Sequence, residues 1–380
     1  MHVSLTVPSF GARVHSLYPP YVRLTYFGPL PPHRGGIAQH GDNLVRSALE
    51  GGHSVQRLSW RRLYPRILFR GDAIEVSHRH GQPPRYVADW NAPSTWVRAV
   101  DLARSGDVLV MPWMTTFHGP VFEVAHRRRH GLPLVGIVHN VLPHERHPGD
   151  RTVARRALGR LDGALVHAAA IATALEELVP GLPIMHVPHP PNLPLQPRPL
   201  PPTTPIRLLV FGFVRAYKGT ENALDAIGWL RRWGCDARLS VVGQFWEPLG
   251  WWEREVERRG LEETVRLDDR YVPDAEVDDL FASHHIILAP YRSATQSGII
   301  PLARAAGRPV VATRVGGIAE TVADGHDGYL APPDDGPAIA AAVQRIVQEI
   351  DRFAEASAQR ATTWSQVVNG LTDLVVRATG

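Results

Sequence analysis

The sequence has a single cysteine, Cys235, among 380 residues, so no disulfide can form within the chain. Scarce cysteine is typical of proteins that work in a reducing compartment. No run of about 18 apolar residues, the length that a membrane-spanning helix needs, is present. Segment 1–20 also lacks the basic start and apolar core of a signal peptide. These absences predict a cytoplasmic protein, with a peripheral position at the inner membrane face as a further expectation.

Lysine is almost missing too. Lys218 is the only lysine, and arginine supplies the rest of the 41 basic residues. Residues 1–190 hold 21 Arg against 13 acidic residues, so the positive charge gathers in the first half of the chain. This surplus favours an anionic partner, such as a phosphorylated or lipid-linked acceptor or an anionic membrane, although a solvated arginine-rich face is an equal alternative. No basic–aromatic repeat indicates a nucleic acid, and no particular oligomeric state is predicted.

Three phosphate-binding motifs are absent. Neither the GxGxxG fingerprint of nicotinamide-binding domains nor the GxxxxGK[ST] loop of P-loop proteins occurs. The chain also has no Asp-x-Asp pair, the carboxylate clamp that holds a metal-bound nucleotide sugar in other proteins. These absences argue against a Rossmann oxidoreductase. They also predict that neither a cofactor nor a metal ion takes part.

The order of expected elements defines the fold class. Short β-branched runs alternate with amphipathic stretches, the pattern of βαβ units and parallel sheets. The alternation stops at the proline-rich segment 188–205, expected to be a stiff linker, and then restarts. The sequence predicts an α/β protein with two Rossmann-like, doubly wound domains facing across a cleft. Their expected ranges are 1–190 and 206–362, and a last helix, about 363–380, returns to the first domain.

Expected strand ends carry the candidate donor site. Gly35 and Gly36 lie between a strand and a helix, where free amides favour an anion. After strand 208–211, Gly212 is followed by Arg215 and Lys218, two cations beside a helix N-terminus that suit a diphosphate. A lysine kept in an arginine-rich chain indicates a position that needs a compact ammonium. The alternatives are an ordinary turn and a pair of surface cations.

Another loop follows strand 286–289. It offers hydroxyl, amide and bare backbone groups to sugar hydroxyls and phosphate oxygens, with Ser297 as the expected helix N-cap. Its candidate residues are Thr295, Gln296, Ser297 and Gly298. Backbone atoms near Tyr271 and Val272 are expected to bind the base.

Histidines mark the first domain. His139 ends strand 134–138, where an imidazole can exchange a proton or bind a sugar hydroxyl. His118 and His144 are expected on the acceptor side. His139, His144 and His147 lack the spacing of a helical zinc-binding pair, so no metal site is predicted there.

Longer stretches resemble one family. GRPVVATRVGGIAETV followed by DGHDGYLAPPDD is similar to the donor-binding region of family 4 glycosyltransferases. VFGFVRAYKG resembles the diphosphate loop of that family, RGGIAQHGDNL its N-terminal glycine loop, and VGIVHN the strand whose terminal histidine faces the acceptor. The last helix, around Trp364, resembles the one that crosses back to the first domain. The resemblance spans nearly the whole chain. It implies the GT-B fold, a nucleoside-diphosphate-sugar donor and retention of anomeric configuration.

Two departures from the family pattern stand out. Phe213 occupies the position where many members carry an arginine, and Arg215 is the nearest cation. Ala294 and Leu302 occupy the positions of a glutamate pair that many members carry. The SATQSG sequence resembles that of a subgroup without the glutamate pair. We expect residues Thr295–Ser297 to make the donor contacts that the glutamates make in other members.

Two hypotheses follow. The first is a retaining, metal-independent glycosyltransferase acting on a hydroxyl acceptor, which is a glycan, a lipid-linked molecule or a small molecule. Lys218, Arg215 and His139 are its expected catalytic residues. The second is a glycosyltransferase-like protein that binds a sugar nucleotide without turnover, which the missing glutamates motivate.

Overall fold

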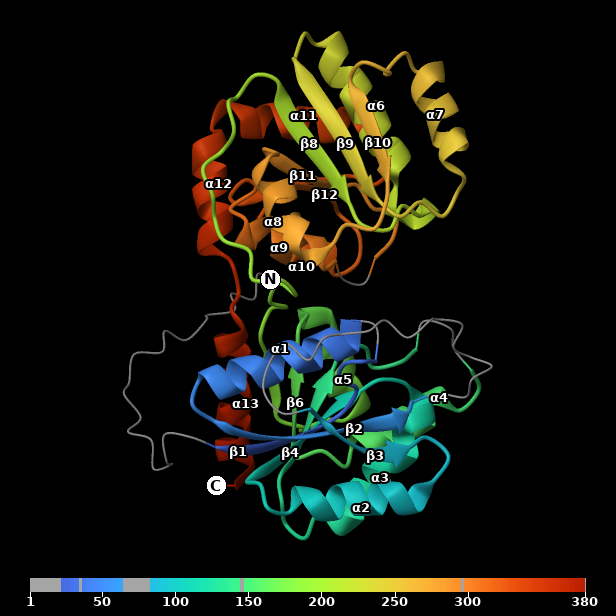
Figure 1. The fold of residues 1–380 in the computed structure, drawn as a ribbon, viewed down its shortest axis with the longest axis vertical. Coiled ribbons are helices and arrows are strands. Elements are labelled where there is room, and N and C mark those ends of the chain that lie inside the picture. Colours follow the sequence, from blue (N-terminus) through green and yellow to red (C-terminus); the bar gives the residue numbers. More distant parts are fainter. Residues whose placement is uncertain (1–21, 34–35, 64–82, 144–146, 295–296, 380) are drawn as a thin grey trace, which may run out of the picture.

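The computed structural model describes residues 22–33, 36–63, 83–143, 147–294 and 297–379. Its two parallel sheets lie one above the other in Figure 1, each with helices on its faces. The seven-stranded sheet has the order β3-β2-β1-β4-β5-β6-β7, and the six-stranded sheet the order β10-β9-β8-β11-β12-β13. The strand order reverses beside β1 in one sheet and beside β8 in the other, as in doubly wound α/β folds.

The first sheet is built from residues before the proline-rich segment. Its strands are β1 Arg23–Phe27, β2 Ser54–Arg62, β3 Arg85–Asp89, β4 Val108–Trp113, β5 Leu134–Val138, β6 Gly163–Val166 and β7 Ile184–His186. All residues of β4, β5 and β6 are buried, because helices cover both faces of a parallel sheet. The helices are α1 Gly36–Glu50, α2 Pro93–Ala103, α3 Gly119–Arg128, α4 Asp150–Leu158 and α5 Ala169–Leu178.

The second sheet follows the proline-rich segment. Its strands are β8 Ile206–Phe211, β9 Ala237–Gly243, β10 Val265–Asp269, β11 Ile286–Ala289, β12 Val310–Thr313 and β13 Gly328–Ala331. The helices are α6 Thr220–Arg232, α7 Leu249–Arg258, α8 Asp274–Ala282, α9 Ile299–Ala305, α10 Ile318–Thr321, α11 Gly336–Gln348 and α12 Ile350–Gln359. Two apolar clusters pack on this sheet, one under α6 and α11 and one under α8 and α9.

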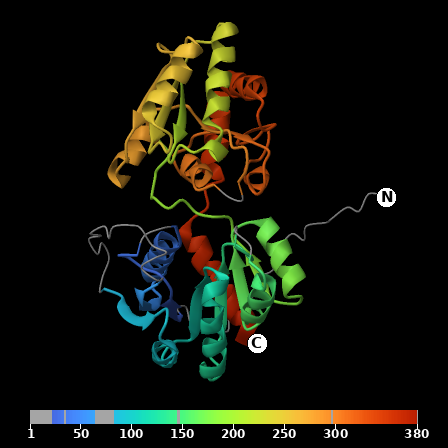
Figure 2. The ribbon, with the colours of Figure 1, turned by 90° about the vertical axis from the view of Figure 1, so that its right-hand side faces the viewer.

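The last helix, α13 Trp364–Thr379, follows the second domain in the sequence but packs on the first sheet. Figures 1 and 2 show this dark red helix inside the lower half of the molecule, beside α1 and the strands. Its buried residues share an apolar cluster with β1, β4, β5 and α1: Val367, Val368, Leu371, Leu374 and Val375. The chain therefore joins the two halves twice, through segment 187–205 and through the α12–α13 connection.

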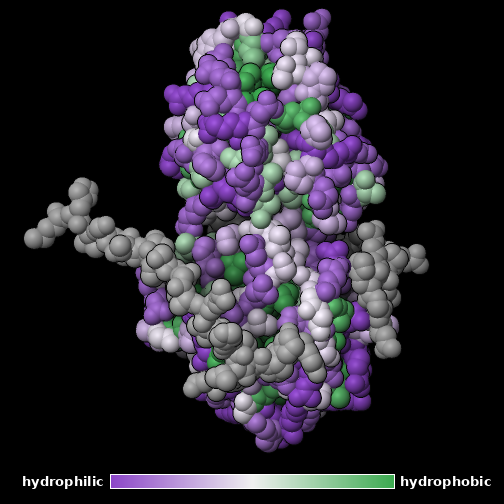
Figure 3. Space-filling view, turned by 90° about the vertical axis from the view of Figure 1, so that its left-hand side faces the viewer, coloured by the Kyte–Doolittle hydropathy of each residue, from purple (hydrophilic) through white to green (hydrophobic). Residues whose placement is uncertain are grey.

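The two halves also touch where strands end. The Glu320 carboxylate, on α10, accepts hydrogen bonds from the amides of Ala169 and Ala170 at the start of α5, at 3.0 and 3.3 Å. Because α5 follows β6 and α10 follows β12, the carboxyl ends of these strands face the same region. Ligands of such sheets bind beyond those ends. On the face shown in Figure 3, hydrophobic residues are scattered among hydrophilic ones.

Candidate functional site

Three loops at the carboxyl end of the second sheet are fastened together. The Gly212 amide, after β8, donates to the Val242 carbonyl at 3.0 Å, and the Arg270 amide, after β10, donates to Gly243 at 3.2 Å. Gly243 has φ +148°, and a Cβ atom there would overlap the carbonyl oxygen of Gly212. Glycine is therefore required at this crossing of two backbones. These hydrogen-bonded loops lie beneath the side chains of the β8–α6 connection.

The Lys218 side chain extends over the loop at Gly212. Lys218 ends a short 3₁₀ turn, Ala216–Lys218, and is followed by Gly219 with φ +62°. A Cβ atom at Gly219 would overlap the Pro290 carbonyl, so the turn lies directly against the end of β11. A Cβ atom at Gly212 would make only an ordinary contact with Lys218 Nζ, at 3.5 Å, but Gly212 has φ +97°, a conformation that favours glycine.

Lys218 and Arg215 form an unneutralised pair of positive charges. Burial, and then the charge of Arg215, lower the pKa of Lys218 to about 8. Within the described part of the chain, neither side chain has a carboxylate partner within salt-bridge distance. The Arg215 guanidinium stacks on the Trp246 ring at 3.4 Å from its centroid, and its buried Nε has no hydrogen-bond partner among the described residues. Two cations held together without a counter-charge form a site for an anion.

The loop after β11 borders the same site. Lys218 Nζ lies 5.4 Å from the centre of the Tyr291 ring, and the Tyr291 hydroxyl lies 3.1 Å from Ser297 Oγ. Ser297 Oγ accepts a hydrogen bond from the Ile299 amide at 3.3 Å. The residue directly before α9, however, is Gly298 and not Ser297, the expected N-cap. Gly298 is exposed, with open space around its Cα. The Tyr291 side chain therefore connects Lys218 with the segment that holds Ser297 and Gly298.

Several predicted residues fall elsewhere. Thr295 and Gln296 lie outside the described residues, as do Gly35 and His144. Gly36 begins α1 and is exposed. After β10, Tyr271 is 62% exposed, whereas Val272 is buried in the core of the second sheet.

His118 lies at the end of a short 3₁₀ turn, Thr116–His118, in the first domain. It is 2% exposed and packs edge-on against the Trp60 ring. Its Nε2 is 3.2 Å from the Leu63 carbonyl, and its Nδ1 is 3.1 Å from Thr115 Oγ1. Both ring nitrogens are therefore occupied by the protein, and burial lowers the pKa of His118 to about 4. His118 is therefore a buried histidine with both ring nitrogens bonded within the protein, and its acceptor-side role stays a prediction.

His139 follows β5, as predicted, but it does not stand alone. Its ring lies 4.6 Å from that of His40, on α1, and 5.7 Å from that of His167, after β6. Burial is the main cause that lowers the pKa of His139, to about 3, so its imidazole is neutral near neutral pH. Sequence reasoning missed this grouping because the three histidines are far apart in the chain. It also missed Trp246, whose contact with Arg215 no local pattern signals.

Comparisons with known proteins agree with this architecture. Residues 205–349 match the family model described as "Glycosyl transferases group 1". HepE from Anabaena, solved in complex with UDP, superposes with a TM-score of 0.68 at 15% identity, covering 93% of this chain and 100% of that one. Sucrose-phosphate synthase from Thermosynechococcus elongatus gives a TM-score of 0.67 at 17% identity, over 93% and 98% of the two chains. The fold is therefore GT-B.

Sequence relatives cover a smaller part of the chain. The D-inositol 3-phosphate glycosyltransferase of Corynebacterium urealyticum is 33% identical over 187 residues, which are 45% of this chain and 43% of the relative. The glycogen synthase of Mycobacterium tuberculosis is 28% identical over 183 residues, 46% and 43% of the two chains. The chain thus matches less than half of the length of these relatives. Within the described residues, no helix has the length and apolar character to cross a bilayer.

Proposed function

We propose that this protein is a retaining, family 4-like glycosyltransferase that moves a sugar from a nucleoside-diphosphate sugar to a hydroxyl acceptor. The observation that carries the proposal is the pair of half-buried, unneutralised cations, Lys218 and Arg215, in the loop after β8. The match of residues 205–349 to group 1 glycosyl transferases supports it, as does the GT-B relative solved with UDP.

The cation pair suits the charge that such a reaction develops. When the bond between the sugar and the diphosphate breaks, negative charge grows on the leaving phosphate. Lys218, Arg215 and backbone amides near Gly298 stabilise that charge where it develops, which is the largest source of catalysis in many enzymes. No Asp-x-Asp clamp is present, so the two side chains take the place of a metal ion.

Retention needs no protein nucleophile in this arrangement. The acceptor oxygen attacks the anomeric carbon on the face that the diphosphate leaves, and the acceptor proton passes to the leaving phosphate oxygen. His139, on the other domain, orients the sugar or the acceptor through a neutral imidazole. The arginine surplus of residues 1–190 supports an acceptor with anionic groups, or one presented at an anionic membrane.

Replacement of the lysine tests the proposal. We expect Lys218→Ala to bind a UDP- or GDP-sugar, whichever stabilises the wild type in a thermal-shift panel, at least about tenfold more weakly, because a charge-assisted hydrogen bond contributes roughly 1.5–3 kcal/mol. Transfer should fall by at least the same factor. Lys218→Arg should also lose activity, since a planar guanidinium does not replace a compact ammonium.

Arg254→Ala is the matched control, because it removes an exposed cation from α7 of the same domain. It should keep wild-type binding and turnover. Normal transfer by Lys218→Ala would contradict the proposal. Donor binding that depends on Lys218, without transfer or donor hydrolysis in the wild type, would instead identify a sugar-nucleotide-binding protein.

A further inference from the structure

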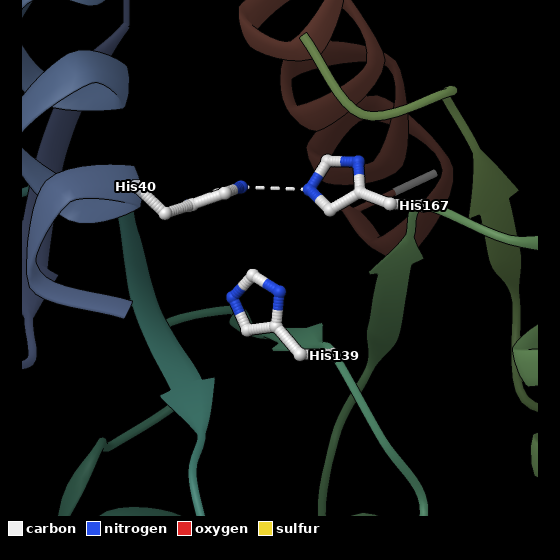
Figure 4. Close-up of side chains that lie close together, drawn as sticks. All are labelled: His40, His139 and His167. Atoms are coloured by element: carbon white, nitrogen blue, oxygen red, sulfur yellow. Dashed lines mark hydrogen bonds between the residues drawn. The ribbon is translucent and has the colours of Figure 1, made fainter. Parts of the chain in front are cut away.

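Three imidazoles converge on the first domain, apart from the cation pair of the second. His40 comes from α1, His139 follows β5 and His167 follows β6, and one nitrogen of each lies within 4.8 Å of the others. Figure 4 shows His40 and His167 joined by a hydrogen bond, with His139 below the pair and the ring carbon between its two nitrogens facing it. His40 is 1% exposed and His167 is 3% exposed.

The hydrogen bonds fix the protons of this group. His167 Nδ1 lies 2.7 Å from the Val187 carbonyl, which can only accept, so this nitrogen carries a proton. The Nε2 of a neutral His167 is then an acceptor, and His40 Nε2 donates to it at 2.7 Å. This leaves a lone pair on His40 Nδ1, which is buried and has no partner among the described residues. His139 Nε2 is also buried without a partner there.

Unpartnered buried nitrogens are costly unless something binds them. Their surroundings offer no proton donor or counter-charge. His189 and Trp364 pack around His40 with ring centres 5.6 and 4.8 Å away, and no carboxylate bonds to any of the three histidines among the described residues. Burial lowers the pKa of each imidazole, which keeps the lone pairs available.

We propose that His40, His139 and His167 bind a divalent transition-metal ion, with Zn²⁺ as the best fit. Imidazole nitrogen is a preferred ligand of Zn²⁺, and three histidines with an open fourth position are an established type of zinc site. The hard cations Mg²⁺ and Ca²⁺ prefer oxygen ligands and do not suit this group. Water or a substrate oxygen completes the coordination.

The ligand nitrogens must shift to accept the ion, because they now lie up to 4.8 Å apart. Zn–N bonds of about 2.0–2.1 Å at tetrahedral angles separate ligand nitrogens by about 3.3 Å. The Nε2 atoms of His40 and His167, now 2.7 Å apart, must open by about half an ångström. The proton on His40 Nε2 moves to Nδ1, so His40 binds as a neutral imidazole, and the unpartnered nitrogen that the ion takes up is His139 Nε2. His167 already has the support typical of a metal ligand, because its other nitrogen donates to a backbone carbonyl.

This site does not rest on the proposed transferase activity, although the two share His139: an ion bound to His139 takes the nitrogen that would otherwise contact the sugar or the acceptor. The metal ligands come from the first domain, whereas the donor cations come from the β8–α6 loop of the second domain. A protein without transfer activity could still bind Zn²⁺, and failure to bind Zn²⁺ would leave the role of Lys218 untouched.

Metal titration of the purified full chain tests the proposal. We expect one Zn²⁺ per chain by competition with a chromophoric chelator, a rise in melting temperature with Zn²⁺, and no rise with Mg²⁺ or Ca²⁺. Co²⁺ in its place should give the intense visible absorption of a four- or five-coordinate ion. X-ray absorption of the zinc-bound protein should show nitrogen neighbours of the imidazole type.

Two variants and a control locate the ion. His40→Ala and His167→Ala should each lose the bound Zn²⁺ and the thermal shift, whereas His326→Ala, which removes an exposed histidine of the second domain, should keep both. The proposal is overturned if the wild type binds no Zn²⁺, or if folded variants bind it as the wild type does. Should the variants not fold, the wild-type spectra decide: a six-coordinate Co²⁺ spectrum or a sulfur neighbour from Cys235 would refute the three-imidazole site.

Discussion

Donor affinity should weaken as the pH rises through about 8, because Lys218 loses its proton there in the free protein. An ordinary lysine, with a pKa near 10.5, would stay charged up to about pH 10. Burial and the charge of Arg215 are what lower the pKa of Lys218. A bound diphosphate reverses that balance: its negative charge favours the protonated amine, so the complex keeps the proton that the free protein has lost.

The sign and size of the effect follow from this linkage. Below about pH 8 the lysine is protonated before and after binding, so the dissociation constant is flat. Above it, each further pH unit should raise the dissociation constant up to about tenfold, until the pKa of the complex is reached. The whole rise is limited by the lysine–phosphate interaction, about 1.5–3 kcal/mol, or roughly 10- to 150-fold.

Isothermal titration of wild type and Lys218→Arg with the same donor, from about pH 7 to about pH 10, measures this effect. The arginine variant stays charged over the whole range, so its weaker affinity should be independent of pH. Lys218→Ala should be weak and equally flat. A flat profile for the wild type, or the same slope in all three proteins, would show that Lys218 does not hold the diphosphate.

Four further outcomes are expected. Transfer should persist in excess EDTA, assayed with and without added Mg²⁺, because Lys218 and Arg215 neutralise the diphosphate; complete loss that Mg²⁺ restores would contradict this. Leu374→Ala, at a fully buried position of α13, should cost about 2–5 kcal/mol in chemical denaturation, whereas Val376→Ala, 41% exposed on the same helix, should cost far less. Removal of residues 363–380 should destabilise the first domain more strongly. Donor binding should lower the radius of gyration in small-angle scattering, and an unchanged radius would argue against closure.

Much of the fold could be predicted from the sequence, because buried parallel strands leave a strong signal. The apolar runs at 134–138, 208–211 and 286–289 form β5, β8 and β11, and the expected pair of doubly wound domains is present. Strands β3 and β13 have a weaker signal in the sequence. β3 reads RYVAD at the edge of its sheet and is only partly buried, and β13 has four residues, two of them only half-buried. Short edge strands carry too few apolar residues to stand out.

The candidate site could be predicted only where its residues lie in one segment. Gly212, Arg215 and Lys218 are close in the sequence, and the structure places them together. The ring of Trp246 stacks on Arg215 only because β8 and β9 are neighbours, a pairing that no local spacing reveals. The three imidazoles come from α1 and from the ends of β5 and β6, so tertiary structure alone brings them together.

The connections between the domains leave little chain free to bend. Asn192 is fastened to the first domain, since its carbonyl accepts from Asn43 Nδ2 at 2.9 Å. Leu195 is already buried in the core of the second domain. In the other connection, Arg360 pairs with Asp327 of the second domain at 2.8 Å. These contacts confine bending to a few residues in each of the two segments that connect the domains.

Trp364 closes the second connection on the side of the first domain. Its indole nitrogen donates to the Pro191 carbonyl at 2.8 Å, and its ring lies edge-on to His40. The two short bending segments, about 192–195 and 360–364, therefore run beside each other, and two adjacent pivots define an axis rather than a loose tether. Rotation about that axis is the motion left to the domains. Because His40 contacts Trp364 and also belongs to the histidine group, an ion bound there would fix α1 and the ends of β5 and β6 beside one end of this axis. Zn²⁺ should therefore stiffen the first domain and leave the closing motion intact in the scattering measurement, since none of the three ligands comes from the second domain.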